Sequence, residues 1–351
     1  MSGDDSIKFM RRCIELAGKA EGMTYPNPMV GSVIVHNGVI TGEGYHLKAG
    51  APHAEVLAIE SVKDKKSLRS STLYVNLEPC SHQGKTPPCA DLIVSHRIPE
   101  VVIGTVDTSS KVAGRGIERL RDAGCRIVTG ILEDECRYLN RRFFTFHERN
   151  RPYIILKWAQ SADGFIDITR NESTAQGPNW ITGKPERVLV HSWRAAEQAI
   201  LAGAGTIRQD NPRLDVREWS GKNPVRIILS GSGNLGKKLA VTELIGSNIV
   251  FTSNGKANIP GALMVKLDSD LTAAKQISSW LFEKGIQSLI VEGGAQTINH
   301  FIKSDLWDEA RIFSGFGSFR NGIRAPVVEG KIEALVSYGL SSLKILVNER
   351  N

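Results

Sequence analysis

The chain has 351 residues, of which 41% are hydrophobic and 23% are charged, so it is neither disordered nor collagen-like nor a disulfide scaffold. Because one domain usually holds roughly 100–200 residues, this length predicts two domains. No apolar run approaches the roughly 18 residues that a membrane helix needs, and residues 1–12 lead into no apolar signal-peptide core. We therefore expect a cytoplasmic protein that does not bind membranes and whose five cysteines are reduced.

The net charge of +7 is unevenly distributed along the chain. Residues 1–148 hold 19 Lys and Arg against 18 Asp and Glu, whereas residues 149–351 hold 25 against 19. The surplus in the second half is diffuse and contains no cluster of basic residues. This pattern favours small phosphorylated ligands, and we expect no nucleic-acid partner.

Apolar spacing in the first half predicts alternating helices and strands. Residues 7–17 have helical spacing, and two strands, 30–35 and 39–40, flank the turn dipeptide Asn37-Gly38. The elements expected next are helices at 54–62, 89–95, 117–123 and 136–146 and strands at 72–77, 101–106 and 126–129. This alternation predicts an α/β domain with a mainly parallel sheet.

A polar break at residues 149–152, ending in a proline, places the domain boundary, so we expect domains at 1–148 and 149–351. The second half is again α/β. Its expected elements are strands at 153–159, 199–202, 226–229, 248–251 and 288–291 and helices at 185–196, 272–284 and 296–304.

The first half contains a candidate zinc site formed by His53, Cys80 and Cys89. One imidazole and two thiolates suit tetrahedral zinc and leave the fourth position for water, which is typical of a catalytic site. Zinc lowers the pKa of such a water, and Glu55, two residues after His53, would move the proton without being a ligand. These residues predict the deamination of a base.

The prolines Pro52 and Pro79 both precede expected helix starts, so we expect the ligands at facing helix N-termini, whose dipoles favour thiolates. Eight residues separate Cys80 from Cys89, whereas the general zinc deaminase signature has about two at that point.

Two other interpretations stay open on these residues alone. The chain would be a zinc deaminase acting on a nucleic-acid base, with a basic RNA-binding second domain. Alternatively, a structural zinc module would serve a nonenzymatic nucleic-acid-binding protein, with His82 or Cys125 as the fourth ligand. Glu55 argues against the structural site, which has no use for a placed carboxylate.

Three segments of the first half carry a family resemblance: PNPMVG at 26–31, GEGYH at 42–46 and LEPCSHQGKTPPC at 77–89. They resemble the bifunctional pyrimidine deaminase/reductase of riboflavin biosynthesis, in which the long cysteine spacing is normal. The resemblance implies a cytidine-deaminase-like α/β/α domain. It also implies a pocket for a ribosylaminopyrimidine 5′-phosphate lined by Asn27, His46, His82, Lys85, Thr86 and Asp107.

The second half resembles the reductase of the same family through KWAQSADG at 157–164, WIT at 180–182, GTIRQDNP at 205–212 and VEGGA at 291–295. The resemblance implies a dihydrofolate-reductase-like α/β domain that uses NADPH. The substrate-binding residues it implies are Lys157, Arg194, Leu214, Arg217 and Glu292. The cofactor-binding residues it implies are Gln160, Trp180, Thr206, Asp210 and Gly294.

The chemistry of these residues agrees with such roles. The turn at residues 292–294 would bring backbone N–H groups close to a pyrophosphate at a helix N-terminus. Arg194 and Arg217 would clamp a substrate phosphate, helped by Lys157. Asp210 and Glu292 are candidate proton donors.

Taken together, the two halves predict an enzyme with one zinc ion and NADPH as cofactors. It would deaminate 2,5-diamino-6-ribosylamino-4(3H)-pyrimidinone 5′-phosphate. It would then reduce the ribosyl group of 5-amino-6-(5-phosphoribosylamino)uracil to ribityl. By the same resemblance we expect a homodimer or higher homo-oligomer.

Overall fold

The computed structural model describes residues 3–81, 87–108, 114–171, 174, 176–236, 239–243 and 248–350. It divides into two compact units, Met1–Asn150 and Arg151–Asn351, and the division lies within the polar break at 149–152. In the described part of the chain, no helix has the length and apolarity needed to span a membrane.

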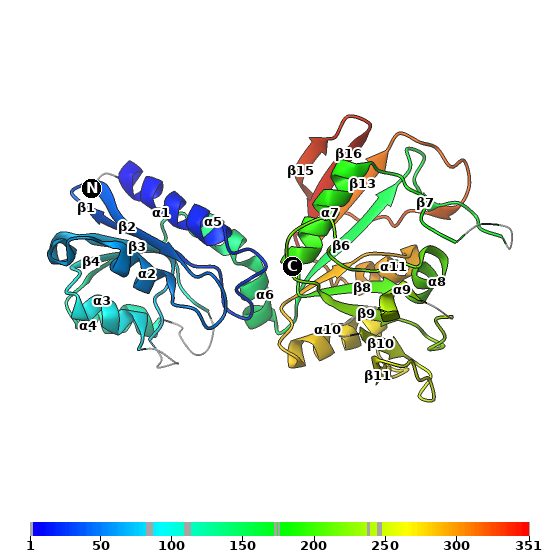
Figure 1. Cartoon of the computed structure of the whole chain (residues 1–351), viewed down its shortest axis with the longest axis horizontal. Helices are drawn as coiled ribbons and strands as arrows, with labels where there is room; N and C mark the ends of the chain where they lie inside the picture. Colours follow the sequence, from blue (N-terminus) through cyan, green and yellow to red (C-terminus); the bar gives the residue numbers. More distant parts are fainter. Residues whose placement is uncertain are drawn as a thin grey trace. The chain divides into compact units, whose positions relative to one another are not determined.

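The first unit is built on a five-stranded sheet with the strand order β2-β1-β3-β4-β5 (Figure 1). Its strands are β1 (Gly31–His36), β2 (Val39–Tyr45), β3 (Thr72–Leu77), β4 (Glu100–Thr105) and β5 (Arg126–Thr129). Strands β3, β4 and β5 are parallel, whereas β1 is antiparallel to both of its neighbours. The predicted hairpin is confirmed, because Asn37 and Gly38 both have the positive φ that a two-residue turn of this kind requires.

Helices cover both faces of this sheet and give it three layers (Figure 1). They are α1 (Gly3–Gly18), α2 (Ala54–Ser61), α3 (Cys89–Ser95), α4 (Arg115–Asp122), α5 (Glu133–Leu139) and α6 (Arg141–Arg149), with a short 3₁₀ turn at Lys65–Ser70. Alternate strand residues face opposite layers. Val33 and Val35 therefore pack in the core with α1, while Ile34 packs in the core with α2.

Helix α2 lies unusually close to β2 because of Gly44. A Cβ atom there would lie 2.7 Å from the backbone nitrogen of Ala58, nearer than real Cβ contacts allow. Only glycine permits this approach. The close packing places the start of α2, and the residues at its N-terminus, against the sheet.

The helix predicted at 136–146 is wrong as a single element, since the chain forms α5 and α6 with a break at Asn140. The reason is a buried side chain. Asn140 accepts a hydrogen bond from the backbone N–H of Met29 at 2.8 Å and donates one to its carbonyl at 2.9 Å. These bonds hold the segment around Met29 in place.

The second unit is built on a nine-stranded sheet with the order β11-β10-β9-β8-β12-β6-β13-β16-β15. Its strands are β6 (Tyr153–Gln160), β8 (Ala199–Gly203), β9 (Val225–Leu229), β10 (Asn248–Thr252), β11 (Ala262–Lys266), β12 (Ser288–Val291), β13 (Glu309–Gly315), β15 (Lys331–Ser337) and β16 (Ser341–Val347). Neighbours from β11 to β13 are parallel, and the last two strands are antiparallel. A separate ribbon pairs β7 (Phe165–Asp167) with β14 (Ile323–Arg324).

The helices of this unit are α7 (Lys184–Ala196), α8 (Ala204–Asp210), α9 (Ala240–Glu243), α10 (Ala273–Glu283) and α11 (Ala295–Lys303). Ile154 and Leu156 on β6 share a core with residues of α10 and α11, while Ile155 faces a second core that includes residues of α7 and α8. Strands β6, β8 and β12 are adjacent and parallel, so their carboxyl ends lie at one edge of the sheet. In open α/β sheets this edge is where ligands bind.

Candidate active sites

Three ligand-type side chains come together in the first unit. The Nδ1 atom of His53 lies 3.6 Å from Sγ of Cys80 and 3.3 Å from Sγ of Cys89. Among the described residues, this is the cluster of His, Cys, Asp and Glu whose ligand atoms fit one metal ion, all within 4.8 Å of one another. One imidazole and two thiolates suit zinc, so the predicted ligand set is brought together by the fold.

The backbone around these ligands differs in part from the expectation. His53 is the N-cap of α2 and Cys89 is the first residue of α3, so these two ligands lie at helix N-termini, as expected. The helix expected after Pro79 is wrong, because Cys80 follows β3 in an irregular segment. There Sγ of Cys80 accepts a hydrogen bond from the backbone N–H of Cys89 at 3.3 Å. Hydrogen bonds from Cys89 and His53 lower the pKa of the Cys80 thiol well below its usual range, despite its burial.

Glu55 lies on the first turn of α2 with only 3% of its surface exposed. Burial, together with the nearby charge of Cys80, raises the pKa of its carboxyl group to about 7. Its carboxylate also interacts with the side chain of Cys89, which places it beside the metal ligands. A carboxyl group in this position can take up and release a proton near neutral pH.

Asn27 and His46, two of the predicted substrate residues, form a hydrogen-bonded pair. His46 Nδ1 lies 3.1 Å from the carbonyl oxygen of Pro52, which can only accept, so this nitrogen carries the proton. His46 Nε2 then accepts from Nδ2 of Asn27 at 3.0 Å. This arrangement leaves Oδ1 of Asn27 as an acceptor. Asp107 is buried after β4, and the other predicted substrate residues, His82, Lys85 and Thr86, lie outside the described residues.

Glu78 is a further residue of this region that the sequence analysis does not single out. Its buried carboxylate accepts backbone N–H hydrogen bonds from Asp107 at 3.2 Å, Gly114 at 3.0 Å, Gly116 at 2.8 Å and Ile117 at 3.3 Å. Its charge therefore lies at the N-terminus of α4. Glu78 thus joins the segment that carries Cys80 to the segment that carries Asp107. Its place two residues before a metal ligand is the only sequence feature that marks it.

We expect Glu78→Gln to loosen α4 while zinc stays bound, because an amide offers one acceptor oxygen and no charge to four N–H groups. Hydrogen–deuterium exchange at Gly116 and Ile117 should become faster by roughly 10-fold or more. Glu118→Gln, which removes an exposed carboxylate from the same helical turn, is the matched control and should leave exchange unchanged. Unaltered protection in the Glu78 variant would show that its carboxylate does not hold the helix.

Cys125 is not positioned to be a fourth zinc ligand. It directly precedes β5, whereas Cys80 follows β3, and these strands are parallel to β4 between them. Cys125 therefore lies at the amino ends of these parallel strands, and Cys80 lies at their carboxyl ends. The Cys125 thiol donates instead to the carbonyl of Ile98 at 3.2 Å. This removes one of the two candidates for a closed structural site.

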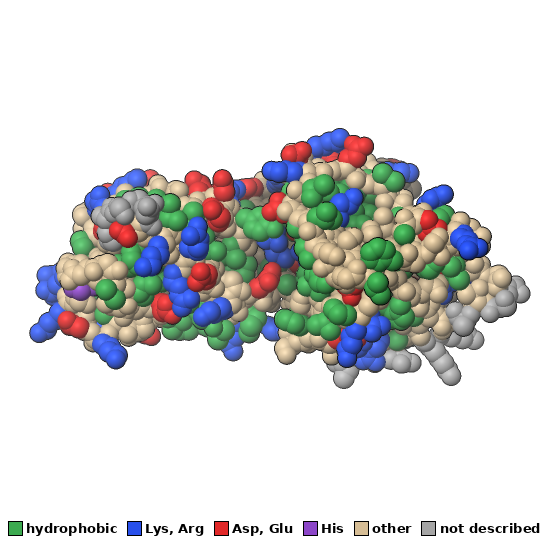
Figure 2. All heavy atoms as spheres, turned by 90° about the horizontal axis from the view of Figure 1, so that it is seen from above, with side chains coloured by type: hydrophobic (Ala, Val, Ile, Leu, Met, Phe, Trp, Pro, Cys, Tyr) green, Lys and Arg blue, Asp and Glu red, His purple; other side chains and the backbone are tan. Residues whose placement is uncertain are grey.

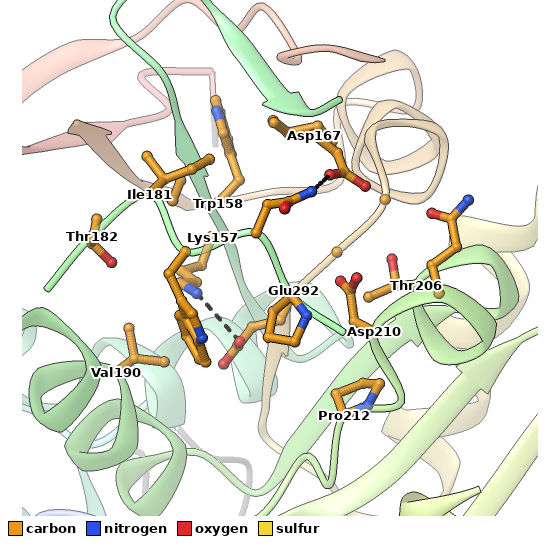
Figure 3. A pocket seen from close by; sticks show the side chains of 18 of the residues that line it. Lys157, Trp158, Asp167, Ile181, Thr182, Val190, Thr206, Asp210, Pro212 and Glu292 are labelled. Atoms are coloured by element: carbon orange, nitrogen blue, oxygen red, sulfur yellow. Dashed lines mark hydrogen bonds and ion pairs between the residues drawn. The ribbon is translucent and has the colours of Figure 1, made fainter. Parts of the chain in front are cut away.

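The second unit contains a pocket of about 480 Å³ at the carboxyl ends of β6, β8 and β12 (Figure 3). Nine of the predicted reductase residues line it: Lys157, Trp180, Arg194, Thr206, Asp210, Leu214, Arg217, Glu292 and Gly294. Gln160 is not among its lining residues, and its side-chain oxygen accepts a hydrogen bond from the Trp158 indole at 3.0 Å. The volume suits a small ligand.

Glu292 forms the centre of a buried ion cluster in this pocket. Its carboxylate accepts two hydrogen bonds from Arg194, at 2.7 and 2.8 Å. It accepts a third from Lys157 at 3.4 Å (Figure 3). Burial raises the pKa of Glu292, but the two cations outweigh it and lower the pKa to about 2. This lowered pKa favours the ionised form of Glu292 at neutral pH, which makes it the weaker of the two candidate proton donors.

These contacts change the expected phosphate clamp. The guanidinium group of Arg194 is occupied by Glu292 and by the carbonyl of Asp215, at 3.1 Å. Arg217 is 43% exposed and is bound to the carboxylate of Asp215 at 2.7 Å, which Arg213 also contacts at 2.8 Å. Arg194 and Lys157 are thus bound to Glu292 and Arg217 to Asp215, and the phosphate clamp by Arg194 and Arg217, helped by Lys157, stays a prediction.

The other wall of the pocket contains Asp210 and the two glycines after β12. Asp210 is bound to Arg170 at 2.9 Å, a partner that the sequence analysis missed. Burial raises the pKa of Asp210 to about 6 despite this cation. Gly293 and Gly294 have φ values of +134° and +60°, and Cβ atoms on them would lie 3.1 and 3.3 Å from Oγ1 of Thr206. The two glycines therefore let the backbone at the N-terminus of α11 approach the side chain of Thr206 closely.

The sequence matches two family models. The cytidine and deoxycytidylate deaminase zinc-binding region matches residues 4–105, and the RibD C-terminal domain matches residues 152–315. Riboflavin biosynthesis protein RibD of Aquifex aeolicus is 39% identical over 312 residues, which cover 87% of this chain and 85% of that protein. The protein of the same name from Bacillus amyloliquefaciens is 39% identical over 314 residues, covering 87% and 83%.

Solved structures show the same architecture over the whole chain. A diaminohydroxyphosphoribosylaminopyrimidine deaminase/5-amino-6-(5-phosphoribosylamino)uracil reductase from Thermotoga maritima is 38% identical, with a TM-score of 0.89 and 99% of both chains covered. RibD of Acinetobacter baumannii is 30% identical, with a TM-score of 0.88 and the same coverage.

The fold, the metal cluster and these matches define a bifunctional enzyme that joins a zinc-binding deaminase region to a reductase domain. The chain belongs to the RibD family of riboflavin biosynthesis proteins. The resemblance stated from the sequence is thereby confirmed, and so are the two predicted fold types.

Proposed function

We propose that residues 1–148 deaminate 2,5-diamino-6-ribosylamino-4(3H)-pyrimidinone 5′-phosphate and that residues 149–351 reduce 5-amino-6-(5-phosphoribosylamino)uracil with NADPH. The observation that carries the proposal is the meeting of three zinc-type ligands with a buried, proton-exchanging Glu55. The structure from Thermotoga maritima, whose description names the corresponding deaminase and reductase, supports it.

In the deaminase, His53, Cys80 and Cys89 would hold one zinc ion, which supplies a water molecule of lowered pKa. Glu55 accepts a proton and returns it to the departing amino group, so that ammonia leaves as a neutral molecule. Asn27, held by His46, presents Oδ1 to a donor group on the pyrimidine. His82, Lys85, Thr86 and Asp107 complete the proposed substrate site.

In the reductase, NADPH would supply a hydride to C1′ of the ribosyl group. Gly293, Gly294 and Thr206 line the pocket at the N-terminus of α11, where backbone N–H groups suit a phosphate-bearing cofactor. Trp180, Asp210 and Gln160 stay proposed as cofactor contacts. Asp210, with its pKa of about 6, is the better candidate proton donor, and the ionised Glu292 orients substrate together with Lys157. Leu214 and Arg217 line the same site.

We also propose that the protein is a cytoplasmic homodimer or larger homo-oligomer that does not bind nucleic acid. Strand β15 is the edge of the nine-stranded sheet, with Ile332 59% and Leu335 71% exposed, and such an edge is suited to pairing with a second copy. On the face shown in Figure 2, basic side chains are scattered among other residue types, which does not favour a nucleic-acid groove.

The test is one assay of purified protein with the diaminopyrimidinone ribosyl phosphate, following ammonia and NADPH absorbance together, with and without a zinc chelator. We expect chelator-sensitive ammonia release followed by NADPH oxidation. Ammonia without NADPH oxidation would leave the nucleic-acid deaminase as the better interpretation. The absence of both would refute the proposed function.

A further inference from the structure

The basic residues that line the pocket of the second unit differ in whether they have an acidic partner. Five of them are bound to carboxylates: Lys157 and Arg194 to Glu292, Arg170 to Asp167 and Asp210, and Arg213 and Arg217 to Asp215. Arg187 also lines the pocket, but among the residues that the structure describes it has no carboxylate partner. Its charge is therefore available to a ligand.

The position of Arg187 is defined by Trp180. The guanidinium carbon lies 4.5 Å from the centre of the indole ring, and both side chains line the pocket. Stacking on an aromatic ring holds a guanidinium group flat and leaves its N–H edges free to donate. Arg187 is also seven residues before Arg194 on α7, so the two arginines lie on the same face of the helix.

One donor of Arg187 is left unsatisfied. Its Nε atom is buried and has no hydrogen-bond partner among the described residues. Leaving a charged donor without a partner is unfavourable, and an anion bound beside the guanidinium group would offset part of that cost. The ligand chemistry that best meets a planar, doubly donating cation is an anionic oxygen pair, as in a phosphate group.

We propose that Arg187, held against Trp180, binds a phosphate group of the ligand in this pocket. This rests on the proposed reductase function, in which two molecules bring phosphate: the pyrimidine ribosyl 5′-phosphate and NADPH. Arg187 thereby adds a positive charge to a pocket in which the guanidinium group of Arg194 is already bound to Glu292.

The test compares Arg187→Met with Arg324→Met in the full-length protein. Arg324 is a matched control, because it also stacks on an aromatic ring, Phe165 at 4.2 Å, but it does not line the pocket. Dissociation constants are measured by titration calorimetry for NADPH and for 5-amino-6-(5-phosphoribosylamino)uracil. We expect Arg187→Met to weaken one of them by about 10-fold or more and the other by less than about 2-fold.

Weaker NADPH binding assigns the phosphate to the cofactor, and weaker pyrimidine binding assigns it to the substrate. In the second case, the wild type and Arg187→Met should bind the dephosphorylated pyrimidine equally. Arg187→Lys should restore part of the affinity, because it keeps the charge and loses only the planar fork. The proposal would be overturned if Arg187→Met left both dissociation constants at the wild-type value. It would also be overturned if the control Arg324→Met weakened binding as much as Arg187→Met does. If the wild type binds neither ligand, the proposed function fails instead.

Discussion

Replacing Glu55 with glutamine should abolish ammonia release, by at least about 100-fold, while zinc content and NADPH oxidation with deaminated substrate stay at the wild-type level. Glutamine has nearly the shape of glutamate, so the packing at the start of α2 is retained. What is lost is a carboxyl group that exchanges a proton near neutral pH. Ammonia release, zinc by atomic absorption and NADPH absorbance are measured on the same preparation.

The matched control is Glu60→Gln, which removes an exposed carboxylate from the same helix and should leave all three readouts unchanged. The combination of readouts separates the two activities. Loss of zinc together with deamination would mean that Glu55 maintains the metal site rather than moving the proton. Loss of NADPH oxidation as well would contradict two independent sites.

The parts of this structure that the sequence could predict are those determined by local pattern. The hairpin depends on two residues, Asn37 and Gly38, whose conformational preference is intrinsic. The metal ligands follow from residue type and from the resemblance. Strands β6 and β12 contain short runs of buried apolar residues, at 153–156 and 289–291, because both faces of the sheet are covered there.

The parts that were missed depend on contacts between distant residues. Strand β15 is exposed along most of its length, so it shows neither the apolar run nor the alternation of a buried strand. The break between α5 and α6 depends on Asn140 bonding Met29, 111 residues away. No local pattern contains that information.

The same limit applies inside the reductase pocket. The sequence identified Arg194, Lys157 and Glu292 separately, and Arg194 was predicted to clamp a phosphate with Arg217, helped by Lys157. Arg194 and Glu292 are 98 residues apart, and only the fold shows that they are paired. The pairing lowers the pKa of Glu292 and so favours its ionised form over a role as proton donor.

The second large effect is expected at this ion cluster. Replacing Glu292 with glutamine leaves Lys157 and Arg194 buried without their counter-charge. The change in its pKa from 4.5 to about 2 corresponds to a stabilisation of about 3 kcal/mol at neutral pH, which the variant should lose. Tryptophan fluorescence during urea unfolding reports on the second unit alone, because all six tryptophans lie at or after Trp158.

The stabilisation that Glu292 provides depends on pH. Glu292 has a lower pKa in the folded than in the unfolded chain, so its stabilisation is fully present above pH 4.5 and disappears as the pH falls towards 2. The stability difference between wild type and variant should therefore shrink below pH 4.5. Glu283→Gln, at an exposed position on α10, should show no difference at any pH.

A double-mutant cycle then separates the ion cluster from a general packing defect. Adding Lys157→Gln to Glu292→Gln removes one of the two stranded cations, so the double variant should be less destabilised than the sum of the single variants. Additive losses would mean that Lys157 and Glu292 do not interact across the pocket. Because the same two residues face the proposed substrate, NADPH oxidation should stay low in the double variant even where stability recovers. Recovery of both together would assign Glu292 a structural role only.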